Sequence, residues 1–448
     1  MSMGLDRPMT MKPTLMLCAA VALVLSGCAQ REEILPGERL NLRDGFLSQE
    51  ADPDQTNSSQ PISLPAAVAS GEWSHRGGAV TRRQGHSALG AGTTLVWATN
   101  IGQGNGRKHR ITADPVVSAG RVFTLDSRAQ VQATSASNGA PIWTKDLTPA
   151  GERQDDASGG GLAVVGGVLY VTTGFGDVVA LDAATGAEIW TQKLEAAVTA
   201  APAVAGSLVY VVSSDNRAWA IETRDGLIRW QFGGTPSPSS VIGGAGPSVA
   251  DDLVLFPQSG GEIVATFRSG GVQRWRARVV GSRLGRAYAR VTDITAGPVI
   301  VGQDVYTGNH SGRVARLSLA DGLPVWTAKE GAQSPLVVAG GSVFLVSDQN
   351  ELLRLSASDG SRIWGVQMAQ YEADRPRRYR DLFAHYGPTL AGGRLWVASD
   401  TGVLRAYAPE SGALVGSVEV PSGAATNPVV ANRTMYIVGQ NGQLQAYR

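Results

Sequence analysis

Few residues of this chain combine the type and the spacing that catalysis or metal binding requires. Its histidines lie apart, without the paired spacing of a metal site: His75, His86, His109, His310 and His385. Asp52 and Asp54 stand in a polar stretch that lacks the repeated carboxylates of an EF-hand calcium loop. The sequence therefore predicts no catalytic residue, no metal and no cofactor, although it leaves open a site assembled from separate repeats.

Cys28 is the residue with a clear modification motif. An apolar run of about 12 residues follows Lys12 and is too short for a bilayer, which needs roughly 20 residues. The run leads into Leu25-Ser-Gly-Cys28, which resembles the lipobox of bacterial lipoproteins. We expect residues 1–27 to be a signal peptide and Cys28 to become the acylated first residue of the mature chain. An ordinary secretory signal followed by a chance cysteine is the alternative.

The segments around Cys28 indicate where the chain is located. Ala29 stands where an aspartate would resemble an inner-membrane retention signal, so we expect the periplasmic face of the outer membrane. Residues 28–72 are polar with little periodicity, which predicts a flexible tether.

The 39 basic and 38 acidic side chains nearly cancel, so no overall field favours nucleic acid or an anionic membrane surface. Translation could begin at Met1 or at Met11.

From residue 73 to residue 448 an internal repeat dominates the sequence. GDVVALDAATGAEIW, which ends at Trp190, has relatives that end at Trp143, Trp230 and Trp326. The period of roughly 38 to 52 residues is typical of propeller blades, and about eight copies are present. Each copy predicts four strands: a short apolar run, a β-rich run, an alternating run and a run that ends in tryptophan. We therefore expect an all-β, eight-bladed β-propeller.

Glycine and tryptophan recur at fixed places in these copies. Pairs such as Thr185-Gly186 lie between the third and fourth strands, where glycine adopts a positive φ without a Cβ clash. A strand follows each pair instead of a helix, so the glycines do not predict a phosphate-binding loop. We expect each tryptophan to pack between neighbouring blades. The seventh copy has Val415-Gly416 in that place, which predicts a less well filled junction.

The two ends of the repeat region predict how the ring closes. The last copy ends at Tyr447 without a tryptophan strand, while residues 94–99 form such a strand without the three that should precede it. Pairing the two fragments completes one blade. It also removes two free sheet edges, which would otherwise promote aggregation.

The pattern G-x-V-x-A-L-D-x-x-T-G-x-x-x-W of residues 176–190 resembles the PQQ-type propeller repeat. Together with the lipobox and the polar tether, eight such blades resemble the BamB lipoproteins of the outer-membrane β-barrel assembly machinery. The resemblance implies a noncatalytic scaffold that binds the polypeptide-transport domains of BamA, joins other Bam components and assists nascent outer-membrane proteins. Delivery of these proteins by β-augmentation and simple positioning of BamA both stay open.

Two other classes of function are alternatives. Quinoprotein dehydrogenases share the repeat, but they are larger chains with a vicinal disulfide and a calcium site, and this propeller contains no cysteine. A periplasmic propeller that binds cell-wall or divisome partners would need aromatic residues clustered on one rim. Trp73, Trp219 and Trp396 show no such clustering in the sequence.

Long loops that depart from the repeat are the candidates for binding. In residues 233–246, the family resemblance implies that the aliphatic pair Val241 and Ile242 contacts BamA, although Ile242 stands where an arginine is expected. In residues 279–297, it implies a partner-facing carboxylate at Asp293.

Other residues of the long loops do not match the family pattern. Arg290, in the same loop as Asp293, is added as a candidate for partner binding, and Thr295 stands where a second carboxylate is expected. Arginine-rich residues 375–380 have no counterpart in the family, and we interpret them as a solvated loop.

Overall fold

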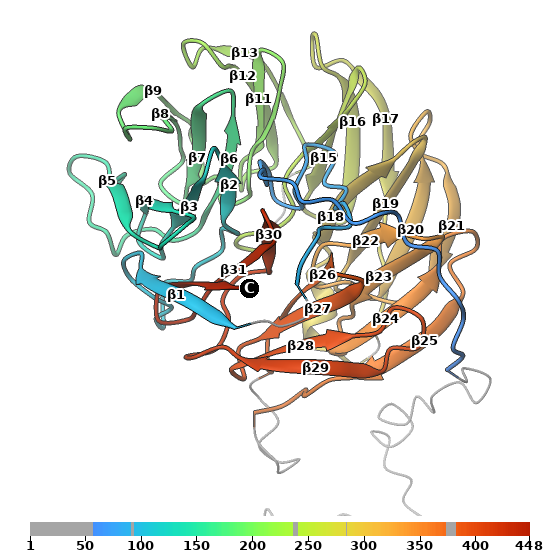
Figure 1. Cartoon of the computed structure of the whole chain (residues 1–448). Helices are drawn as coiled ribbons and strands as arrows, with labels where there is room; N and C mark the ends of the chain where they lie inside the picture. Colours follow the sequence, from blue (N-terminus) through green and yellow to red (C-terminus); the bar gives the residue numbers. More distant parts are fainter. Residues whose placement is uncertain (1–56, 91–93, 236–240, 284, 373–381) are drawn as a thin grey trace, which may run out of the picture. The chain divides into compact units, whose positions relative to one another are not determined.

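The computed structural model describes residues 57–90, 94–235, 241–283, 285–372 and 382–448. Within these residues the strands form eight antiparallel four-stranded sheets, the blades of a β-propeller (Figure 1). This confirms the all-β, eight-bladed fold predicted from the repeats. The described part of the chain contains no helix long and apolar enough to cross a membrane.

Each blade is an antiparallel meander whose first strand is innermost. Blades one to four are β2 (Val116–Ser118), β3 (Arg121–Leu125), β4 (Gln130–Ser135), β5 (Pro141–Asp146); β6 (Gly160–Val165), β7 (Val168–Thr173), β8 (Asp177–Asp182), β9 (Glu188–Lys193); β10 (Ala203–Ala205), β11 (Leu208–Val212), β12 (Arg217–Glu222), β13 (Ile228–Gly233); and β14 (Ser248–Ala250), β15 (Leu253–Gln258), β16 (Glu262–Phe267), β17 (Gln273–Arg278). Blades five to eight are β18 (Ile294–Val301), β19 (Asp304–Asn309), β20 (Arg313–Ser318), β21 (Pro324–Ala328); β22 (Val337–Ala339), β23 (Ser342–Val346), β24 (Glu351–Ser356), β25 (Arg362–Gln367); β26 (His385–Ala391), β27 (Arg394–Ser399), β28 (Val403–Tyr407), β29 (Leu414–Glu419); and β30 (Val429–Ala431), β31 (Thr434–Val438), β32 (Gln443–Tyr447), β1 (Leu95–Asn100).

Blade eight is built from both ends of the repeat region, as the sequence predicts. β1 pairs antiparallel with β32, from Leu95 opposite Tyr447 to Asn100 opposite Gln443. The backbone N–H of Arg448 also donates to the carbonyl of Thr94 at 3.0 Å. The ring is therefore closed by hydrogen bonds between strands and not by a continuous chain.

The tryptophans pack between blades, as expected. The indole of Trp143 in blade one lies against the turn of blade two, where a Cβ built on Gly186 would lie 2.7 Å from the ring. The indole N–H donates to the carbonyl of Ala183 in the same turn at 3.2 Å. The outer strands do not end at the tryptophan as predicted, since β9 continues past Trp190 to Lys193.

The seventh blade differs from the others in where its indole lies. In blade two, Tyr170, Ala180 and Trp190 form a row across the second, third and fourth strands. The equivalent row in blade seven is Trp396, Ala406 and Gly416, so the indole lies on the second strand. The expected gap is present at the outer strand, because a Cβ on Gly416 would have just the Cβ of Ala406 within 4 Å, at 3.8 Å.

The described part of the predicted tether, residues 57–72, makes specific contacts with the propeller. The backbone N–H of Ser58 donates to the carbonyl of Ile363 on β25 at 3.0 Å. The side-chain amide of Asn57 pairs with both backbone groups of Gly365, each at 2.9 Å. Residues 57 and 58 therefore lie along the outer edge of blade six. Residues 1–56, with the expected signal peptide and Cys28, lie outside the described residues.

Residues 73–89 pass through the centre of the propeller, where the blue segment is drawn in Figure 1. Their backbone groups share hydrogen bonds with the innermost strands of several blades. The pairs are Trp73 with Val117, Ser74 with Val164, Val80 with Val249, Thr81 with Ile300, and Ser87 with Leu390. The side chains of His75 and Arg82 in this segment are 3% and 5% exposed. The chain thus fills the centre of its own ring.

Candidate partner-binding surface

The two candidate loops lie at the same end of the propeller. Because the strands of each blade alternate in direction, the connections between blades and the turns between second and third strands share one end. We call this end the entry face. The loop from β13 to β14 carries Val241 and Ile242, and the loop from β17 to β18 carries Arg290 and Asp293.

Val241 and Ile242 are exposed aliphatic residues on the entry face. The two residues are 37% and 61% exposed. The side chain of Ile242 lies over the loop that enters blade two, where a Cβ on Gly159 would meet its Cγ2 at 2.9 Å. The pair is therefore held against the propeller while much of its apolar surface stays open to solvent.

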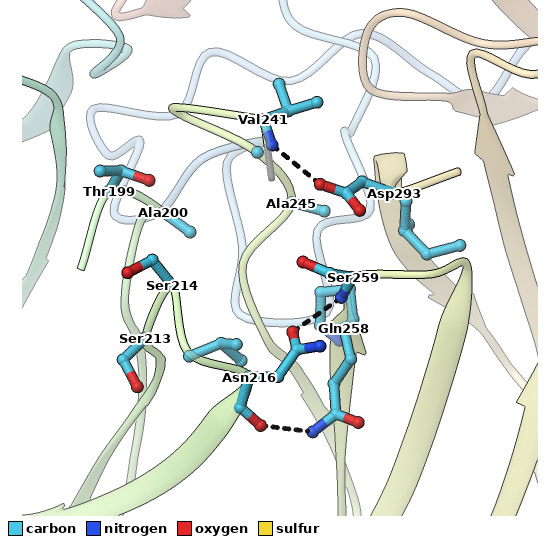
Figure 2. Close-up of a pocket in the computed structure, with 14 residues that line it drawn as sticks. Thr199, Ala200, Ser213, Ser214, Asn216, Val241, Ala245, Gln258, Ser259 and Asp293 are labelled. Carbon is cyan, nitrogen blue, oxygen red and sulfur yellow. Dashed lines mark hydrogen bonds between the residues drawn. The ribbon is translucent and has the colours of Figure 1, made fainter. Parts of the chain in front are cut away.

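Asp293 anchors this loop from the neighbouring connection. Its carboxylate accepts a hydrogen bond from the backbone N–H of Val241 at 2.8 Å (Figure 2). It also accepts one from the backbone N–H of Gly260 at 3.2 Å. The residue is 7% exposed. The structure thus brings Asp293 together with Val241, but directs its carboxylate at the protein's own backbone. Direct contact of Asp293 with a partner stays a prediction.

Arg290 is exposed at the end of the 3-10 helix η2 (Ala287–Arg290). Among the described residues its guanidinium has no hydrogen bond or ion pair, so it is free to meet an anionic group. Thr295, at the place of the expected second carboxylate, donates its hydroxyl to the carbonyl of Ala332. Thr295 therefore stabilises the connection between blades five and six.

A buried ion pair fixes the loop from β17 to β18, and the sequence analysis did not detect it. Arg283 binds the carboxylate of Asp348 through two hydrogen bonds, at 2.8 and 2.9 Å. Tyr288 donates its hydroxyl to the same carboxylate at 3.2 Å, and burial, followed by the Asp348 charge, raises the pKa of Tyr288 to about 12. Arg283 and Asp348 are 65 positions apart in the chain, so no local motif could reveal them.

A small cavity with a mixed polar and apolar lining lies beside Val241 and Asp293 at the junction of blades three and four. Figure 2 shows Asn216 and Gln258 on its other side, where Gln258 donates to the carbonyl of Asn216 at 3.1 Å. Its volume is about 50 Å³. Ligand pockets for drug-sized molecules measure about 300 to 1,000 Å³, so this cavity suits a short side chain or a few waters.

Other residues considered from the sequence do not form a site on the surface. Trp73, Trp219 and Trp396 are 4%, 3% and 2% exposed, so they do not offer the aromatic rim that a sugar-binding propeller would need. Within the described ranges no cluster of three or more His, Cys, Asp or Glu side chains could hold a metal. The arginine-rich residues 375–380 lie outside the described residues.

The fold and the repeat define the class as a PQQ-type β-propeller. A family model described as "Outer membrane protein assembly factor BamB" matches residues 127–366 and 376–448. The chain therefore belongs to the BamB family.

Curated relatives support this assignment. The BamB of Yersinia pestis is 25% identical over 359 residues, which are 79% of this chain and 88% of the relative. The BamB of Escherichia coli (strain K12) is 24% identical over 353 residues, which are 78% and 87% of the two chains.

Solved structures show how widely this fold is shared. The crystal structure of BamB from Moraxella catarrhalis matches with a TM-score of 0.66 at 20% identity, covering 80% of this chain and 99% of that one. A quinohemoprotein alcohol dehydrogenase from Comamonas testosteroni matches with a TM-score of 0.65 at 15% identity, covering 85% and 81%. At such identities the likeness concerns the fold alone.

Proposed function

We propose that this protein is a noncatalytic subunit of the outer-membrane β-barrel assembly machinery that binds the polypeptide-transport domains of BamA. Membership of the BamB family supports the assembly role, because the relatives carry the name of outer membrane protein assembly factor. Acyl chains on Cys28 would anchor it at the periplasmic face of the outer membrane. There it would join other Bam components and assist nascent outer-membrane proteins.

The observation that carries the proposed binding surface is the exposed pair Val241 and Ile242 on an anchored loop. Apolar side chains that are already held in place lose little conformational entropy on binding, so they make good interface anchors. Arg290 on the neighbouring connection adds an exposed guanidinium that pairs with no other described residue, a group suited to a partner's carboxylate.

The filled centre of the propeller supports a noncatalytic role. Small ligands bind in concave pockets, and in a propeller the central channel is one natural place for them. Residues 73–89 occupy that place here and hydrogen-bond the innermost strands.

Purification of the full chain from membranes, beside a Cys28→Ser variant, tests the proposal. We expect BamA to co-purify with the wild-type protein, and the variant to be folded and soluble in the periplasm. A variant that still pellets with membranes after a high-salt wash would contradict the lipid anchor. A bound quinone near one per chain, together with dye-linked alcohol oxidation, would overturn the noncatalytic role.

A further inference from the structure

The N-terminal segment reaches the candidate surface from inside the ring. Arg76, in the segment that fills the centre, donates from Nη1 to the carbonyls of Gly243 and Gly244 at 3.0 and 3.1 Å. These two glycines directly follow Val241 and Ile242. The aliphatic pair is therefore attached on one side to Asp293 and on the other to Arg76.

Arg76 is itself firmly placed. Its Nε lies 3.2 Å from a carboxylate oxygen of Asp114, and the two side chains are 17% and 6% exposed. Asp114 also accepts hydrogen bonds from the backbone and side-chain N–H groups of Asn427, at 2.9 and 2.8 Å. The carbonyls after Ile242 are thus connected, through Arg76 and Asp114, to the entry to blade eight.

A second arginine of the same segment holds the end of the loop. Arg82 donates from Nε to the carbonyl of Pro247 at 2.8 Å and from Nη2 to the carbonyl of Ala201 at 3.1 Å. Pro247 directly precedes β14, so the loop is gripped again where it enters blade four. Both arginines bind backbone carbonyl groups. Neither side chain has to contact a partner at the surface to do this.

We propose that the segment containing Arg76 and Arg82 is a structural part of the partner-binding site, in which Arg76 is a positioning residue for Val241 and Ile242. The inference rests on the proposed function. Gly243 adopts φ +71° and is followed by a second glycine, so this stretch has wide conformational freedom unless it is held. In this proposal only the conformation of the loop that Arg76 holds fits the partner. Loss of the Arg76 hydrogen bonds would therefore lower the fraction of molecules that are competent to bind.

This role makes a kinetic prediction that differs from that of a contact residue. Loss of a positioning residue reduces the competent fraction and therefore the association rate, whereas loss of a contact mainly raises the dissociation rate. For Arg76→Ala we expect association with the purified periplasmic domains of BamA to slow by about tenfold, with dissociation changed by less than about twofold. Amide hydrogen exchange of residues 241–247 should also become faster.

Three further variants make the test decisive. Arg83→Ala removes an exposed arginine of the same segment and should behave as wild type. Arg76→Lys retains a charge beside Asp114 but offers a less suitable donor geometry, so it should give an intermediate association rate and serves if Arg76→Ala fails to fold. Val241→Asp with Ile242→Asp removes the proposed contacts.

The outcomes separate the inference from the proposed function. If the Val241/Ile242 double variant binds like wild type, the proposed surface is wrong. If that variant loses binding while folded Arg76→Ala and Arg76→Lys retain wild-type association rates and wild-type exchange of residues 241–247, the inference about Arg76 is overturned. Slower association of Arg76→Ala, with a dissociation rate changed by less than about twofold, supports the inference.

Discussion

The indole of Trp190 in blade two covers Gly226 in blade three. A Cβ built on Gly226 would lie 2.7 Å from the ring, and the indole N–H donates to the carbonyl of Thr223 in the same turn at 2.9 Å. Gly226 also adopts φ +75°. The glycine is therefore required both by its backbone conformation and by the indole that packs on it.

Gly226→Ala should destabilise the protein by roughly 3 kcal/mol or more, because it adds a steric clash to about 1 to 2 kcal/mol of left-handed backbone strain. Gly120→Ala is the matched control: Gly120 has φ +72° but no atom within 4 Å of the added Cβ. Denaturant unfolding of both variants measures the difference. Equal losses of unfolding free energy would show that the indole accommodates the methyl group at no cost.

The repeat made this part of the fold predictable. Each copy carries the same apolar runs, turn glycine and tryptophan, so strand order, blade number and ring closure follow from the sequence. The position of Trp396 was not predictable in the same way. Trp396 lies on the second strand of blade seven. In the neighbouring blade eight, the third and fourth strands are β32 and β1, which are not joined by the turn that would receive an outer indole.

His75 predicts a pH dependence of stability. Burial, followed by the charge of Arg82, lowers the pKa of His75 from 6.5 to about 3. The folded state therefore holds the neutral ring, while the unfolded chain takes up a proton below pH 6.5. Unfolding free energy should fall as the pH drops from about 6.5 toward 3, by about 1.4 kcal/mol per pH unit for this group.

His75→Gln tests this assignment. Glutamine retains an acceptor for the backbone N–H of Val204, which donates to the His75 ring at 3.1 Å, but it does not titrate. Denaturant unfolding between pH 7 and pH 5 should show a shallower loss of stability in the variant than in the wild type, by roughly 2 kcal/mol over this range. Identical slopes would mean that His75 does not contribute to the pH dependence.

The contacts of Arg354 predict how the N-terminal segment is held on the outside of the ring. This buried side chain donates to the carbonyls of Gln60 at 2.8 Å and Glu410 at 3.1 Å. Arg354→Ala should free residues 57–62, which limited proteolysis would detect as new cleavage in this stretch. Arg316→Ala is the matched control, because Arg316 stands opposite Trp326 as Arg354 stands opposite Trp364, but binds Asp304 instead. Equal protection of the segment in all three proteins would contradict the assignment.

The docking of this segment and the anchoring of the candidate loops could not be inferred from the sequence. Residues 73–89 make isolated backbone hydrogen bonds to strands that are far apart in the chain, and such contacts leave no periodic pattern. In the sequence, His75 and Arg82 are therefore isolated polar residues with no recognisable pattern. The family resemblance led to Asp293, but only the structure reveals that its carboxylate binds the backbone of Val241.

The proposed surface predicts a selective effect on partner binding. Val241→Asp with Ile242→Asp places two charges where an apolar contact is expected, and should weaken capture of BamA by at least about tenfold, or about 1.4 kcal/mol. Both side chains are exposed, so the melting temperature should change little. Val272→Asp with Leu323→Asp is the control, because these residues are 65% and 64% exposed but lie in turns at the opposite end of the blades. Surface plasmon resonance measures both. Equal affinities of the two double variants would remove the entry face from the binding site, while loss of binding confined to the first would identify it as the contact surface.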